Sequence, residues 1–255
     1  MGQGRDRTAL RVGRTAGALG AVIAAVAVMA AGCSVRTDDP RSGSPSTTAS
    51  ASSSASPSGS PGVSRAPAPA PSIIDKPPTT APVAEPELRT ELLAMLVQDQ
   101  AVRTGVAPPG DARTAGELAG DWDETDRRNN ARMAEILDEH GWPGWRLVGS
   151  DGAFAAWVLV QHADLDVPLQ ERGLTLMTTA VEQGDADPSD HAYLVDRVRV
   201  AKGEPQAYGT QWGADATGKP EPRTPIEDEA QVDVRRAKVG LGTIDAYLEE
   251  LASME

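Results

Sequence analysis

Apolar residues recur at helical spacing from residue 87 onwards. In the first segment they return every three or four positions, at Leu88, Leu92, Met95, Leu96 and Val102. The next segment starts around Asp123–Asp126, places Met133, Ile136 and Leu137 on one stripe, and ends at HGWP. Gly141 predicts a left-handed cap there, and Pro143 prevents continuation. The pattern predicts two amphipathic helices.

A third segment, AFAAWVLVQHA at 153–163, is apolar on every side for eight residues. A helix without a polar face belongs in the middle of a fold, and a buried strand is the alternative. Two further helices are predicted from an aspartate cap closely followed by a proline, at Asp166 with Pro168 and at Asp187 with Pro188. Glycines predict their ends.

The stretch EPQAYGTQWG at 204–213 breaks the helical pattern. Tyr208 and Trp212 would share one face of an extended chain, and Gly209 permits close backbone approach. A short strand or hairpin is therefore expected near residues 204–213, followed by two C-terminal helices after Pro225. The expected fold is mainly α, with a single helical domain over residues 87–255.

The N-terminal 32 residues have the pattern of a signal peptide: four arginines, then an uncharged run from Thr15 to Gly32 that is too weakly apolar for a spanning helix. Small residues precede Cys33, the single cysteine, and resemble the lipobox of bacterial lipoproteins, although Ala30 replaces the preferred leucine. The resemblance implies a lipid anchor on Cys33 at the extracytoplasmic face of the cell membrane. An ordinary secretory signal with an incidental cysteine is the alternative.

Residues 33–86 are predicted to be a disordered linker behind this anchor. Ser34–Pro86 holds 13 serines and 11 prolines and no aromatic residue, so it cannot form a core. Arginine outnumbers lysine 20 to 4, which is typical of a GC-rich bacterial genome such as that of an actinobacterium.

Charge and cysteine usage exclude several classes of function. Residues 87–255 carry 32 acidic and 16 basic side chains, a net charge of 16 − 32 = −16, which argues against nucleic acid as a partner. A single cysteine excludes an internal disulfide and zinc sites built from several thiolates.

Known chemical signatures are absent, and no cofactor or metal is predicted. GADATGKP at 213–220 imitates a phosphate loop, but Pro220 replaces the magnesium-binding hydroxyl residue. DADPSD lacks the glycine and the glutamate of a calcium loop.

The motif VQHADLD provides the main candidate for chemistry. His162 ends an apolar segment and needs a polar partner, because a buried unpaired group costs about 1–3 kcal/mol. It is a candidate general base, oriented by a carboxylate such as Asp196 or Asp164. A metal alternative would use His162, Asp164, Asp166 and His191. A structural histidine at a helix C-terminus is the third interpretation. Asp99 with Arg103, and Asp196 with Arg197, are interpreted as ion pairs that brace helices.

Seven motifs, in order along the domain, resemble the uncharacterised bacterial family called domain of unknown function 6624. They are DQAVR at 99, HGWP at 140, VQHADLD at 160, YLVDRV at 193, QAYGTQW at 206, PIEDEAQVDVRRAKVGL at 225 and YLEEL at 247. The resemblance supplies no activity. It implies a polar pocket shared by His162, Asp196, Arg197, Gln206, Tyr208 and Gln211.

Three functional hypotheses follow. The first is a binding module for a small molecule or a cell-wall fragment, with Tyr208 and Trp212 in apolar contact and Arg197, Gln206 and Gln211 as hydrogen-bond groups. The second is a hydrolase with His162 as general base and Asp196 as its partner. The third is a purely structural role in the envelope.

Overall fold

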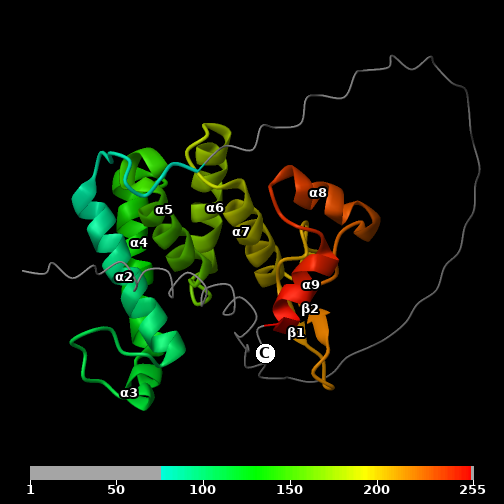
Figure 1. The fold of residues 1–255 in the computed structure, drawn as a ribbon, viewed down its shortest axis with the longest axis horizontal. Helices are drawn as coiled ribbons and strands as arrows, with labels where there is room; N and C mark the ends of the chain where they lie inside the picture. Colours follow the sequence, from blue (N-terminus) through cyan, green and yellow to red (C-terminus); the bar gives the residue numbers. More distant parts are fainter. Residues whose placement is uncertain (1–75, 254–255) are drawn as a thin grey trace, which may run out of the picture.

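A computed structural model describes residues 76–253 (Figure 1). The predicted signal peptide, Cys33 and most of the predicted linker lie outside these residues. Five longer helices and one short helix come first: α2 (Pro86–Thr104), α3 (Ala115–Gly120), α4 (Trp122–His140), α5 (Trp145–Gln161), α6 (Val167–Glu182) and α7 (Pro188–Ala201). The remaining elements are β1 (Trp212–Ala214), β2 (Pro220–Pro222), η1 (Glu229–Gln231), α8 (Val232–Lys238) and α9 (Ile244–Ser253). The described part of the chain is mainly α, as predicted.

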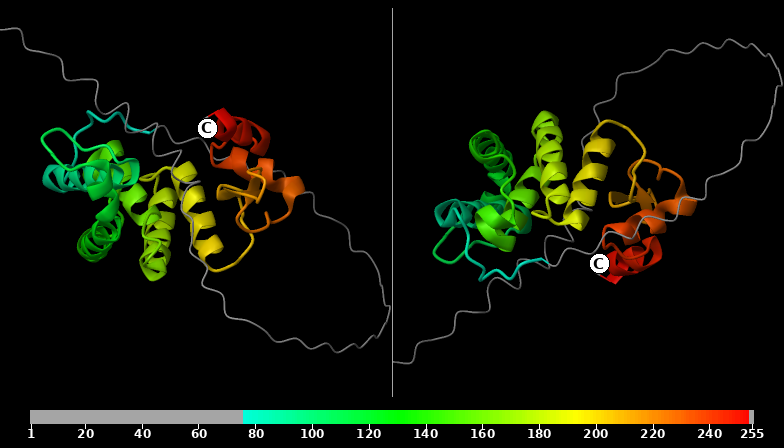
Figure 2. Two further views of the ribbon diagram at one scale, coloured as in Figure 1. Left: turned by 90° about the horizontal axis from the view of Figure 1, so that it is seen from below. Right: turned by 90° about the horizontal axis from the view of Figure 1, so that it is seen from above.

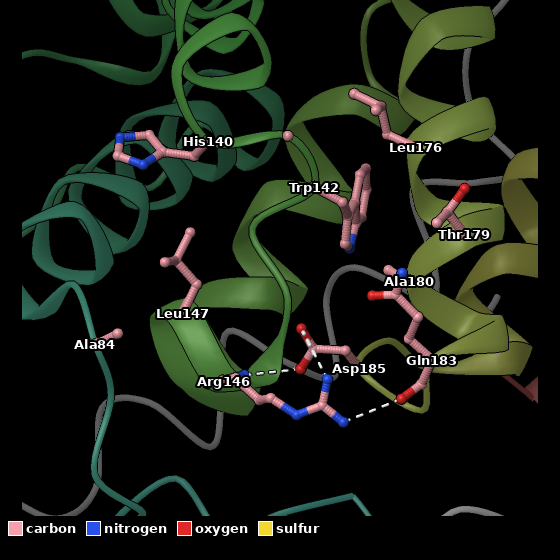
Figure 3. A pocket seen from close by; sticks show the side chains of 11 residues that line it. Ala84, His140, Trp142, Arg146, Leu147, Leu176, Thr179, Ala180, Gln183 and Asp185 are labelled. Atoms are coloured by element: carbon pink, nitrogen blue, oxygen red, sulfur yellow. Dashed lines mark hydrogen bonds and ion pairs between the residues drawn. The ribbon is translucent and has the colours of Figure 1, made fainter.

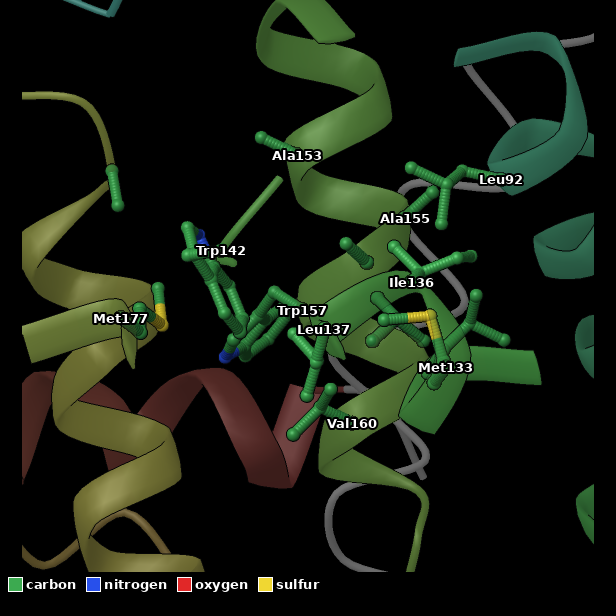
Figure 4. Packing of buried hydrophobic residues seen from close by; sticks show 14 of the residues in the cluster. Leu92, Met133, Ile136, Leu137, Trp142, Ala153, Ala155, Trp157, Val160 and Met177 are labelled. Atoms are coloured by element: carbon green, nitrogen blue, oxygen red, sulfur yellow. The ribbon is translucent and has the colours of Figure 1, made fainter. Parts of the chain in front are cut away.

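Helix α5 occupies the centre of the fold because its residues 152–160 carry no polar side chain. It contacts α2, α4, α6 and α7. Leu92, Met133 and Ile136 lie on one side of it and Trp142 and Met177 on the other (Figure 4). Leu92, Met133 and Ile136 have no exposed surface, and burying each such side chain contributes roughly 1.5–3 kcal/mol. The prediction of a central helix is confirmed.

Helix boundaries follow the predicted caps closely. The carboxylate of Asp166 accepts a hydrogen bond from the N–H of Leu169, and that of Asp187 accepts one from Ser189. α4 ends at His140, as expected from HGWP. Its cap Gly141 has a φ of 70° but a ψ of −146°, so it is not in the left-handed helical conformation that the sequence predicted. Trp142 and Pro143 then lead the chain directly into α5.

The C-terminal elements form a small unit beside α7, which separates them from α2 and α4 (Figures 1 and 2). The predicted short strand near 204–213 is confirmed. Trp212 of β1 pairs with Pro222 of β2 and Ala214 with Pro220, and Gln206 forms a separate bridge with Ile226. The motif GADATGKP (213–220) contains the end of β1, the start of β2 and the turn between them. The carboxylate of Asp215 accepts hydrogen bonds from the N–H groups of Thr217 and Lys219, which closes the turn.

Between residues 76 and 253, no helix has the length and apolar character needed to span a bilayer.

Candidate functional site

Polar side chains from four helices meet at the C-terminal end of α5. Asp99 and Arg103 lie one turn apart near the end of α2, Asp126 lies in the first turns of α4, and His162 caps α5. The fourth helix, α7, contributes Arg197. A buried helix end needs polar partners, and here these partners are ionisable side chains.

The imidazole of His162 is oriented by Asp99. Nδ1 of His162 lies 2.8 Å from Oδ2 of Asp99, and both residues are buried. Nε of Arg103 also approaches Nδ1 at 2.9 Å, but it lies 3.1 Å from Oδ1 of Asp99. Nδ1 could accept from Arg103 or donate to Oδ2 of Asp99. We assign the proton to Nδ1, because a lone pair there would face the carboxylate oxygen and Arg103 can use Oδ1 of Asp99 instead. Nε2 then has an unprotonated lone pair and no hydrogen-bond partner among residues 76–253.

Arg103 joins the His162 pair to α4. Its Nη2 lies 2.7 Å from Oδ1 of Asp126, and its guanidinium stacks 4.7 Å above the ring centre of Trp122. The indole Nε1 of Trp122 donates to the other oxygen of Asp126 at 3.1 Å. A guanidinium suits this position because its planar fork can serve two carboxylates and an aromatic face at once.

A second ion pair lies on the solvent side of the cluster. Nε and Nη2 of Arg197 donate to the two oxygens of Asp164 at 2.9 and 2.6 Å, and Nη1 donates to Oε1 of Gln211 at 3.0 Å. The Arg197 side chain is 7% exposed, whereas that of Asp164 is 40% exposed. The cluster therefore opens to solvent at the turn between α5 and α6.

Burial sets the protonation states of the site. Burial lowers the pKa of His162 below its ordinary value, against the opposing charge of Asp99. For Asp99 burial acts to raise the pKa, but His162 and Arg103 outweigh it and hold the pKa below its ordinary range. Burial raises the pKa of Asp126 to about 6, despite the charge of Arg103. At neutral pH the site therefore holds an uncharged imidazole beside the carboxylates of Asp99 and Asp126.

Several buried amide atoms beside the site have no hydrogen-bond partner in the described chain. They are both side-chain atoms of Gln161, Oε1 of Gln170 and Oε1 of Gln100. Nε2 of Gln170 is used, since it donates to the carbonyl of Gln161 and to Asp164. Buried amides are normally paired, so these atoms are available to water or to a ligand.

Asp196 does not orient His162, contrary to the sequence-based expectation. Its carboxylate accepts hydrogen bonds from the backbone N–H groups of Ala207, Tyr208 and Thr210 and from the hydroxyl of Thr210, at 2.6–3.2 Å. These donors fold residues 206–211 around a single buried carboxylate. Asp196 therefore shapes the loop that carries Gln211.

The predicted binding residues divide between the site and this loop. Arg197 and Gln211 belong to the site. Gln206 stabilises the loop instead: its side-chain amide donates a hydrogen bond to the carbonyl of Gln211 and accepts one from the N–H of Gln211. Trp212 is also internal to the loop, with Nε1 donating to the carbonyl of Gly209 at 2.7 Å. Tyr208 contributes its backbone N–H to Asp196, and its ring is partly buried.

The potential metal ligands do not come together. Nε2 of His191 lies 2.9 Å from the hydroxyl of Thr178 on α6, in a different part of the domain from the VQHADLD motif. Across residues 76–253, no three His, Cys, Asp or Glu side chains are arranged to hold a metal ion.

Asp99, Arg103, Trp122 and Asp126 are site residues that sequence reasoning missed. The sequence predicts an ion pair between Asp99 and Arg103 that braces helices, and this pair forms; its contact with His162 was not predicted. A buried position for Asp99 could have been inferred from its place next to the apolar stripe of α2.

Comparison with protein families gives one result. The model of a family of unknown function, DUF6624, matches residues 86–254. Neither the curated proteins nor the solved structures include a match to the chain.

Proposed function

The chain belongs to the DUF6624 family, and we propose that its helical domain is a hydrolase in which Nε2 of His162 is the general base. The observation that supports this proposal is that the two ring nitrogens of His162 have different surroundings. Nδ1 is held 2.8 Å from the buried carboxylate of Asp99, while Nε2 has no partner among the described residues. A carboxylate on one ring nitrogen fixes the tautomer and leaves the other nitrogen free to accept a proton.

The proposed reaction uses water as the nucleophile. Nε2 removes a proton from a water molecule as the water oxygen bonds to the electrophilic carbon of the substrate. The same proton then passes from the imidazolium to the leaving group as the bond to that group breaks. Asp99 stabilises the transient positive charge on the ring. General acid–base catalysis of this kind contributes about 10²–10⁴-fold to a rate.

Charge pairing favours an uncharged substrate. The two arginines of the site already serve Asp99, Asp126 and Asp164, so the cluster has no spare positive charge for a phosphate or a dicarboxylate. An uncharged ester or amide is the substrate class that fits this balance.

The test is hydrolysis of a panel of uncharged esters and amides by the full chain and its variants. We expect His162→Ala to lose activity by about 10²–10⁴-fold and Asp99→Asn to lose a similar factor. The matched control is His140→Ala, because His140 is exposed and lies at the other end of α5. Activity that survives His162→Ala, or a panel on which the wild type shows none, contradicts the proposal.

A binding role without turnover is the second candidate, and the unpaired amide atoms of Gln161 and Gln170 favour it. A small molecule or cell-wall fragment that reached them would raise the melting temperature by mass action. Thermal-shift screening of the full chain separates the two functions. A ligand that stabilises the protein and is recovered unchanged supports binding alone.

For the location we propose a lipid-anchored protein at the extracytoplasmic face of the cell membrane, attached through Cys33. This proposal depends on the sequence pattern around Cys33 and on the Ser/Pro-rich composition that follows it. Two acyl chains on one cysteine give stable anchoring. Mass spectrometry of the mature protein should find an acylated Cys33 at its N-terminus. An unmodified thiol, or a different first residue, contradicts this assignment.

A further inference from the structure

A separate pocket lies at the opposite end of α5 from His162. It is formed where the HGWP turn leads from α4 into α5, with the second half of α6 on its other side (Figure 3). Its volume is about 430 Å³, within the range of clefts that bind small molecules. The two sites lie at opposite ends of α5, whose course bends at the non-helical residue Gly149.

The walls of the pocket are mainly apolar. Leu147 from α5, Leu176 and Ala180 from α6 and Ala84 from the segment before α2 line it, together with the indole of Trp142. These side chains offer contact to a short aliphatic group, but they cannot orient it.

One buried donor supplies the orientation. Nε1 of Trp142 is shielded from solvent and has no acceptor in the described part of the chain. In Figure 3 the nitrogen edge of the indole points toward the side of the pocket where Asp185 and Gln183 lie. Nε1 of Trp157 is also buried without an acceptor, but only Trp142 lines this pocket. Buried indole N–H groups are normally paired, so Nε1 of Trp142 is the donor that a molecule in the pocket would satisfy.

The charged groups at the rim are already engaged with one another. Nη2 of Arg146 donates to the carbonyl of Gln183 at 3.0 Å, and Nη1 lies 3.9 Å from Oδ2 of Asp185. Oδ1 of Asp185 accepts the backbone N–H of Arg146 at 2.8 Å. One cation and one anion therefore balance, and the pocket does not favour a charged ligand.

We propose that this pocket binds a small uncharged molecule that presents a carbonyl group on a short aliphatic chain, as an N-acyl group or a primary amide does. The carbonyl oxygen accepts the hydrogen bond from Nε1 of Trp142, and the aliphatic chain packs against Leu147 and Leu176. This site is independent of the function proposed for His162.

The experiment titrates the full chain with hexanamide and follows the indole ¹H–¹⁵N resonances of its five tryptophans. The Trp142 resonance is assigned with Trp142→Phe. We expect a saturable shift of this resonance, with the other four little changed. Hexanoate and hexylamine have the same chain with a charged head, and each is expected to bind at least about tenfold more weakly.

Two variants test the location of binding. Thr179→Phe places a ring at the exposed mouth of the pocket and should abolish the shift. Thr175→Phe, the same change one turn earlier on α6 and outside the lining, should retain it. Trp142→Phe lacks the reporting resonance, so its binding is measured by isothermal titration calorimetry beside the wild type; it should bind hexanamide about tenfold more weakly, the factor expected for one hydrogen bond. The proposal is overturned by the absence of a saturable shift, by equal shifts with the charged probes, or by unchanged binding to Thr179→Phe.

Discussion

His162 is uncharged at neutral pH because its ring is buried and its nearest cation is Arg103. Burial holds the pKa of His162 in the folded protein below its value in the unfolded chain, which is about 6.5. Between these two pKa values the unfolded state binds a proton that the folded state does not. The free energy of unfolding therefore decreases as pH falls below about 6.5, and this decrease is complete once pH has fallen through the folded pKa.

The prediction is that His162→Gln removes this pH-dependent loss. Asp126 contributes in the opposite sense over the same range, because its folded pKa of about 6 exceeds its unfolded value and protonation stabilises the fold. The difference between wild type and His162→Gln isolates the histidine. Urea unfolding at several pH values between about 5 and 8 measures it. His140→Gln is the control. A difference curve that is flat with pH would show that folding does not shift the pKa of His162, and a slope of the opposite sign would show that folding raises it.

Some site residues could be predicted from the sequence and others could not. His162 was a candidate because a polar residue ending an apolar run needs a partner, and Arg197 and Gln211 were candidates because the family resemblance implied a shared polar pocket. The partner Asp99 lies 63 positions away on α2, and no local spacing reveals such a contact. The role predicted for Asp196 was wrong for a related reason. Its partners are backbone N–H groups, which nearly every residue has, so no residue type in the sequence indicates them.

At the scale of elements, the loop 206–211 is held in place from both sides. Asp196 binds its N–H groups, while Nη1 of Arg236 donates to the carbonyl of Tyr208 at 2.8 Å. Tyr247 of α9 donates to the carbonyl of Thr210 at 3.1 Å. A Cβ at Gly209 would lie 2.7 Å from Ile226 and 2.8 Å from Ile244. Residues 206–211 are held in this loop, so the predicted strand is confined to β1 at the end of the stretch.

We predict that Asp196→Asn destabilises the protein by about 3 kcal/mol, because an amide cannot accept all of the backbone hydrogen bonds and one of its N–H groups would face another donor. The control is Asp138→Asn, whose exposed pair with Arg172 should matter by less than about 0.5 kcal/mol. Urea unfolding compares the two variants. Equal losses would show that the loop contributes little to stability.

The start of α5 offers a second test. A Cβ at Gly144 would lie 2.4 Å from Oδ2 and 2.6 Å from the carbonyl oxygen of Asp185, the residue that accepts the first N–H groups of α5. Gly144→Ala should therefore destabilise the fold by about 1–3 kcal/mol through overpacking. Gly116→Ala, in α3 with nothing within 4 Å, should stabilise it by about 0.5–1 kcal/mol. Thermal unfolding of both variants checks the opposite signs.

At the scale of the whole molecule, one buried helix organises two separate sites. The apolar pattern of α5 was enough to predict its central position and the mainly α fold. It could not predict what gathers at its two ends, because those groups come from α2, α4, α6 and α7 and meet only after packing. The small C-terminal unit contributes to the His162 site through Gln211.

The entry of the chain into the fold has a mechanical consequence. The N–H groups of Ala84 and Glu85 bond the carbonyls of Arg146 and Leu147. Arg89, one turn into α2, forms two hydrogen bonds with Asp151 on α5. A pulling force applied to the chain through residues 76–83 would therefore act first on these hydrogen bonds, at the Trp142 end of α5.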